Sequence, residues 1–138
     1  MNGSTIVSAE LDLRLVVPDH DAVPLVASLN YRGDDPYAVR MAFHVGSDEP
    51  IEWIFARELL TAGHECPAGD GDVQVWPDGV DGEVLNIALS SPFGHALFEA
   101  PAAAVAEFVR RTYNLVPAGR ECDFVDFDSE IDELLWQR

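Results

Sequence analysis

Lysine is absent from this chain, and cations of any kind are scarce. All eight basic side chains are arginines, against 25 aspartates and glutamates, and the formal net charge is −17 at pH 7. Proteins bind nucleic acids and anionic lipid surfaces through cations that displace counterions. The shortage of cations therefore predicts that the partner is no nucleic acid and no anionic membrane surface.

Cysteine is rare, and long apolar runs are missing. The only two cysteines, Cys66 and Cys122, lie in no C-x-x-C pattern, so we expect reduced thiols, with a single disulfide between them left open. No apolar run approaches the roughly 18 residues that a membrane span requires, which predicts no direct membrane insertion. Residues 1–15 alternate polar and apolar side chains instead of forming a signal peptide. These features predict a cytoplasmic protein.

The chain does contain enough apolar residues for a packed core. Of its 138 residues, 48% are hydrophobic and 24% are charged, which is typical of a folded protein rather than a disordered one. A chain of this length usually forms one domain. We therefore expect a single domain over residues 1–138.

Four segments in the first part of the chain alternate apolar with polar residues, the period of a half-buried strand. Turn-forming residues separate these segments at 18–21, 33–36 and 46–50. Turns of this size join neighbouring antiparallel strands. The pattern predicts an antiparallel meander with strands at 7–17, 25–32, 37–45 and 51–55.

A helix is predicted next, followed by more strands. Residues 56–62 are good helix formers, and Gly63 is placed to supply the left-handed residue that follows a helix. Three further strands are expected between glycine-rich turns, with a fourth short strand around 64–67. The three strands are predicted at 72–76, 83–90 and 95–99.

The second helix is predicted to begin near Pro101. Val105, Phe108, Val109 and Thr112 have the spacing of one helical face. Arg110 and Arg111 follow on the same segment, and we expect them to complement the negative end of the helix dipole. The order of strands, helix, strands and helix predicts an α+β fold.

The tail over residues 119–138 is strongly acidic. Seven of the residues from 121 to 133 are Asp or Glu. Ile131, Leu134 and Leu135 nevertheless share one helical face, which predicts a short C-terminal amphipathic helix.

Catalytic and metal-binding patterns are incomplete throughout the chain. The run at 90–94 lacks the first glycine of the nucleophile elbow G-x-S-x-G. His64 and Cys66 are possible metal ligands without a second ligand pair at useful spacing. The acidic turn at 69–72 has neither the cation of a phosphate loop nor the ligand spacing of an EF-hand. We therefore expect no enzyme activity, no metal and no cofactor.

Six blocks of sequence, in register over about residues 7–135, resemble the SsgA-like proteins of filamentous, sporulating actinomycetes. The length and the opening Ser8-Ala9-Glu10-Leu11 favour the SsgB branch of that family. The blocks are Asp35–Val39, Trp53–Leu60, Gly69–Pro77, Ala88–Gly94, Leu97–Pro101 and Phe108–Thr112.

The resemblance implies a role in sporulation-specific cell division. Members of this kind help to place the division septum by recruiting the tubulin-like protein FtsZ, together with another SsgA-like protein. The family is also associated with a homotrimer and with a fold similar to the whirly proteins, in which two antiparallel four-stranded sheets are each followed by a helix. The strand and helix order derived above agrees with that arrangement.

The expected partner surface is apolar. FtsZ proteins are acidic as a class, so a chain of net charge −17 gains little from charge attraction. Phe93, in a Pro-Phe-Gly turn, and Leu134, Leu135 and Trp136, at the end of the tail, are therefore the candidate partner-binding residues. Gly119 is expected to set the angle at which the tail leaves the second helix.

Two other functions remain open. Whirly proteins bind single-stranded nucleic acid, which is an alternative function that the charge of this chain disfavours. A small-molecule or metal-binding regulator is the third possibility. The sequence favours a non-catalytic interaction protein that acts at the division septum.

Overall fold

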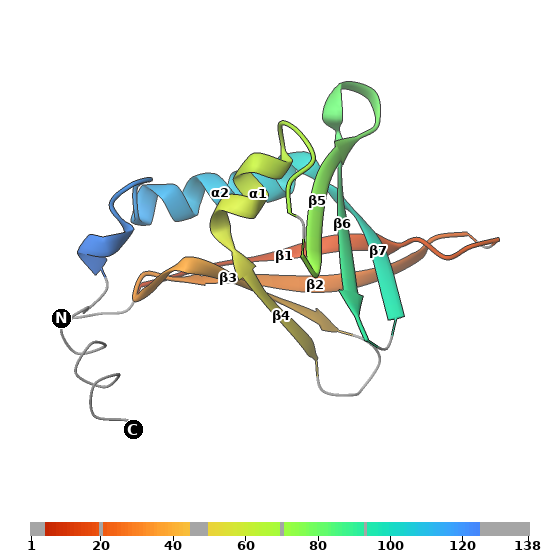
Figure 1. Ribbon diagram of the computed structural model, residues 1–138, viewed down its shortest axis with the longest axis horizontal. Helices are drawn as coiled ribbons and strands as arrows, with labels where there is room; N and C mark the ends of the chain where they lie inside the picture. The colour runs from red at the N-terminus through yellow and green to blue at the C-terminus, as the bar shows by residue number, and fades with distance from the viewer. Residues whose placement is uncertain (1–4, 20, 45–49, 70, 93, 125–138) are drawn as a thin grey trace.

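The computed structural model describes residues 5–19, 21–44, 50–69, 71–92 and 94–124. Strands make up most of this part of the chain, and the helices follow the fourth and seventh strands (Figure 1). In chain order the elements are β1 (Ile6–Leu15), β2 (Val23–Arg32), β3 (Asp35–His44), β4 (Ile51–Ala56), α1 (Arg57–Gly63), β5 (Val73–Asp78), η1 (Val80–Gly82), β6 (Val84–Ser91), β7 (Gly94–Pro101), α2 (Ala102–Leu115) and η2 (Glu121–Phe124).

The strands in the described ranges form one antiparallel sheet of seven, in the order β4-β3-β2-β1-β7-β6-β5. β1 pairs with β2 over its whole length, but it pairs with β7 only through Arg14↔Glu99 and Leu15↔Phe98. The sheet curls at this short link, so that β5–β7 cross over β1–β4 (Figure 1). The two halves therefore face each other across a shared core.

The α+β class and the predicted order of strands and helices are confirmed, with a helix after β4 and another after β7. The prediction of two four-stranded sheets is not confirmed, because the described residues form one sheet of seven strands. The strand expected at 64–67 is absent from it. The N–H groups of Glu65 and Cys66 both donate to Ala62 O, so this backbone is bonded to the end of α1, and only Ala68 forms a bridge to β5.

Gly63 has a different role from the one predicted. It is the last residue of α1 and does not have a positive φ angle. Instead α1 packs closely on β5: a Cβ added at Gly63 would lie 2.3 Å from Val75 Cγ1. The residue is glycine because of this close approach, and not because the helix ends in a left-handed conformation.

The core lies between the curled sheet and the helices. α2 buries the predicted face of Val105, Phe108, Val109 and Thr112 and packs against β1, β6 and β7, while α1 packs against β3 and β5. The helices follow the ends of β4 and β7 and close that end of the curled sheet (Figure 1). The opposite ends of the strands are left without a helix in the described ranges.

Neither described helix is both long and apolar enough to cross a membrane.

Candidate protein-interaction surface

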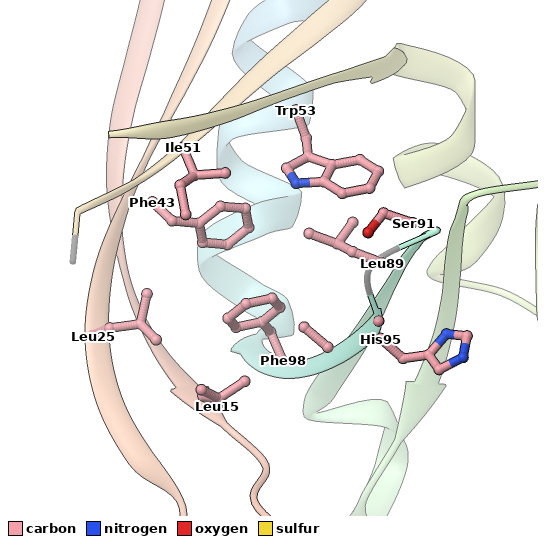
Figure 2. Close-up of a pocket in the computed structure, with 11 residues that line it drawn as sticks. Leu15, Leu25, Phe43, Ile51, Trp53, Leu89, Ser91, His95 and Phe98 are labelled. Carbon is pink, nitrogen blue, oxygen red and sulfur yellow. The ribbon is translucent and has the colours of Figure 1, made fainter. Parts of the chain in front are cut away.

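An apolar cavity opens at the end of the curled sheet that the helices leave uncovered. Its volume is about 390 Å³, within the range of pockets that bind ligands. In Figure 2, Trp53 and Ile51 lie on β4, and Leu89, His95 and Phe98 lie on the β6–β7 hairpin across the cavity. The cavity, called the seam groove below, is lined by Leu15, Leu25, Phe43, Ile51, Trp53, Leu89, Ser91, Gly94, His95, Ala96 and Phe98.

The seam groove has a floor of buried aromatic side chains and an exposed rim. The rings of Phe43 and Phe98 stack with their centroids 4.6 Å apart, and both residues are buried. Ile51 at the rim is 56% exposed. Among the residues that the structure describes, no aspartate, glutamate or arginine lines the groove. This surface can therefore bind apolar groups without burying a charge.

A second cluster lies at the helical end of the molecule, around Arg57. The Arg57 side chain is only 2% exposed, although it carries a charge. Its Nη1 donates to Thr112 O (3.1 Å) and Val116 O (2.8 Å), and its Nη2 pairs with Glu121 Oε2 at 2.7 Å. The guanidinium carbon also lies 3.8 Å from the centroid of the Tyr113 ring.

The contacts near the end of α2 differ from the prediction that Arg110 and Arg111 complement its dipole. Arg110 pairs instead with Glu107, and Arg111 Nη1 donates to Ser8 O on β1 at 3.0 Å. Because α2 extends to Leu115, neither arginine lies in its last turn. Arg57, which comes from α1, donates to Thr112 O in the last turn and to Val116 O just after it, and its charge complements the helix dipole.

The ionisable groups around Arg57 are shifted by their surroundings. Burial raises the pKa of Tyr31 to about 12, and its hydroxyl donates to Pro36 O at 2.8 Å. The pKa of Glu121 is lowered, first by a hydrogen bond with its own backbone and then by the Arg57 side chain. The contacts of Arg57 thus join α1, the end of α2 and η2, which lies in the described part of the acidic tail.

The candidate partner-binding residues Phe93, Leu134, Leu135 and Trp136 lie outside the described residues, and so does the predicted C-terminal helix. Gly119 is described. It has a φ angle of +83°, and a Cβ built there would have no atom within 4 Å. The backbone after α2 therefore has a conformation that favours glycine at this position, and the role of Gly119 in setting the angle of the tail stays a prediction.

The structure places the candidate metal-ligating and thiol groups as follows. Among the described residues no group of three His, Cys, Asp or Glu side chains could hold a metal ion. The two ring nitrogens of His64 contact Leu60 O (2.8 Å) and Ala102 O (3.1 Å), which joins α1 to the start of α2. Cys66 and Cys122 are both free and exposed.

Sequence reasoning missed Arg57 and the seam groove. Arg57 is three residues before the buried Leu60, so it shares the inward face of α1, and this spacing was the available signal. The inward positions of Ile51 and Trp53 followed from the strand period. The groove itself depends on the curling of the sheet, which no local pattern encodes.

Comparison with known proteins identifies the family. The model that describes the Streptomyces sporulation and cell division protein SsgA matches residues 25–121. The chain belongs to the SsgA family. It is 57% identical to the sporulation-specific cell division protein SsgB of Thermobifida fusca, over 97% of this chain and 98% of that protein. SsgB of Streptomyces coelicolor is 50% identical, over 96% of this chain and 97% of the relative.

Solved structures in the SsgA family share this fold. The SsgA-like sporulation-specific cell division protein of Thermobifida fusca has a TM-score of 0.86 at 56% identity, covering 97% of this chain and 98% of that one. A structure reported with SsgB mutations that correlate with longitudinal cell division in Streptomyces coelicolor has a TM-score of 0.84 at 50% identity. The match covers 90% of this chain and 98% of the chain in that structure. The predicted placement in the SsgA-like family is confirmed.

Proposed function

We propose that this chain is a sporulation-specific cell division protein that positions the division septum by recruiting FtsZ through protein–protein contacts. The SsgB relatives, at 57% and 50% identity, support the cell-division role. FtsZ is the partner that the family resemblance implies. The role requires no catalysis, metal or cofactor.

The seam groove is the observation that carries the contact-based part of this proposal. It is concave, apolar and open at the surface, and the described residues of its lining include no carboxylate and no guanidinium. An exposed apolar site of this kind marks a surface that binds a partner. It also suits an acidic partner, because a chain of net charge −17 would repel such a partner over most of its surface.

A pull-down with purified FtsZ tests the proposal. The full chain should retain FtsZ, and a fluorescent fusion should accumulate at septa in a sporulating actinomycete. Single-stranded DNA serves as the competing ligand in the same assay, because a whirly-type function would bind it in a salt-sensitive way. Retention of the DNA and not of FtsZ would contradict the proposal.

Self-association is part of the same proposal. We expect a homotrimer, and we expect a second SsgA-like protein to share the septal assembly. Light scattering on the purified chain at micromolar concentration should return three times its mass of 15.1 kDa. A monomer across the whole concentration range would contradict the trimer without affecting the FtsZ assay.

A further inference from the structure

The two edges of the curled sheet are protected very differently. β5 is covered along part of its outer side by Ala68, whose N–H donates to Val75 O (2.8 Å) and whose carbonyl accepts from Val75 N–H (3.0 Å). Pro77, within β5, removes one further backbone donor. This edge therefore has little capacity to pair with another strand.

β4 lacks this protection. Among the described residues it pairs with β3 alone, from Phe43↔Ile51 to Ala38↔Ala56. Its six residues contain no proline and a single charge, Glu52. Exposed edges of natural sheets are usually shortened, bent or charged so that they do not pair with other chains. An edge that is apolar and regular is therefore expected to pair with a strand of another chain.

The side chains of β4 are also arranged to receive a strand. Ile54, on the outer face, is 53% exposed, and Ile51, on the inner face, is 56% exposed. Trp53 projects into the seam groove beside Ile51 (Figure 2). Because side chains alternate between the two faces of a strand, a segment paired with β4 places every second side chain over the groove.

We propose that the free edge of β4 binds an extended peptide segment of a partner protein as an additional strand, with its alternate apolar side chains in the seam groove. The segment itself is basic between its apolar positions, even where the partner as a whole is acidic, because Glu52 and the net charge of −17 disfavour an acidic segment. This inference rests on the proposed function, since it describes how the recruiting surface recognises its partner.

A second copy of this chain fits the edge less well. Antiparallel pairing of β4 with the β4 of another copy is symmetric, so each pair of chains would use up both free edges. It would also generate a two-fold dimer rather than the expected trimer. A peptide supplies the missing backbone donors and acceptors without either consequence.

A random library of peptides of about twelve residues, displayed on phage, tests the edge with the full chain as the target. Enriched peptides should be apolar at every second position and basic between. The synthetic peptides should slow amide hydrogen exchange over β4. A library without enriched peptides, or with peptides that protect other segments, overturns the proposal. Binding of a fatty acid such as dodecanoate in the groove, without binding of any peptide, also overturns the proposal.

Two variants and one matched control locate the contact. Ile54→Lys should weaken peptide binding about ten-fold or more, because it replaces exposed apolar surface at the edge by a charge that repels a basic strand. Trp53→Ala should do the same from within the groove. Val80→Lys makes the same charge change at an apolar residue that is 74% exposed, in η1 and outside the groove lining, and should bind normally. Equal affinities for Ile54→Lys and Val80→Lys overturn the proposal.

The same variants separate this inference from the proposed function. If wild type and Ile54→Lys bind FtsZ equally well, the recruiting role stands and the β4 edge is not the site. If wild type does not bind FtsZ at all, the recruiting role fails, and the peptide library still decides whether the edge accepts a strand.

Discussion

Arg57 is a charged residue buried where most proteins place an apolar one. Burial of a guanidinium is tolerated only when its donors are paired, and here the pairing spans α1, α2 and η2. Buried ion pairs of this kind add little net stability, but they penalise the loss of one partner heavily. The Arg57 cluster therefore fixes how three elements meet more than it raises the stability of the whole chain.

Replacement of Arg57 by methionine tests this role. Arg57→Met keeps an apolar stem but removes the side-chain donor to Val116 O and to Thr112 O, which keeps the backbone N–H of Val116, and it leaves the Glu121 carboxylate without its cation. We expect a loss of about 3 kcal/mol in the free energy of unfolding, measured by urea denaturation. Arg110→Met removes an exposed pair with Glu107 and is the control, with an expected loss below about 0.5 kcal/mol. Equal losses would contradict the capping role.

The lowered pKa of Glu121 makes a further prediction about pH. A carboxyl whose pKa is lower in the folded state stabilises the fold above its unfolded value, near 4.5, and loses that contribution as the pH falls through the folded value. Wild type should therefore be more stable than Glu121→Gln at about pH 7, and the difference should shrink towards about pH 3. Urea denaturation of both proteins along this range measures it. A difference that is independent of pH would show that the carboxylate charge is not involved.

Two glycines, in α1 and before η2, are needed for different reasons. Gly63→Ala places a methyl group 2.3 Å from Val75 Cγ1, and overpacking of this severity costs about 3 kcal/mol. Gly119→Ala meets no atom within 4 Å but must keep φ near +83°, at about 1 kcal/mol. Thermal unfolding of both variants should show the larger loss for Gly63→Ala. The reverse order would mean that α1 moves away from β5 at little cost.

At the scale of elements, the period of two in the sequence identified the strands well. The inward residues of β1 to β4 could be named from alternation alone, and the apolar face of α2 from its helical spacing. Pro77 and Asp78 were expected in a turn, yet both continue β5. Proline is accepted there because β5 is an edge strand, and a strand's place in the sheet is set by tertiary pairing, which the local sequence does not show.

The curling of the sheet accounts for what sequence reasoning missed. The link between β1 and β7 consists of two residue pairs and brings residues separated by more than 80 positions into contact. Both the seam groove and the position of Arg57 against the end of α2 depend on this long-range arrangement. The site residues named from the sequence were chosen as apolar residues in turns and in the tail, which is a local criterion, so they could not include Trp53.

At the scale of the whole molecule, the net charge of −17 determines which kind of contact with an acidic partner is favourable. Long-range repulsion slows the approach of an acidic partner and is screened by salt, with a screening length of about 10 Å at about 0.1 M. Apolar contacts are not weakened in this way. Salt therefore distinguishes an interface held by apolar burial from one held by charge pairs.

We predict that FtsZ binding persists, or strengthens, when the salt concentration is raised from about 0.05 M to about 0.3 M. The affinity is measured by titration with one of the two proteins immobilised on a surface. Phe93→Ala and Trp136→Ala remain predicted to weaken binding at both salt concentrations without lowering the melting temperature, because the apolar anchors of an interface carry most of its affinity. Arg32→Ala is the control, since that side chain forms an exposed pair with Asp34 and should leave FtsZ binding unchanged. Loss of binding at the higher salt, with both aromatic substitutions neutral, would show that charge pairs hold the complex.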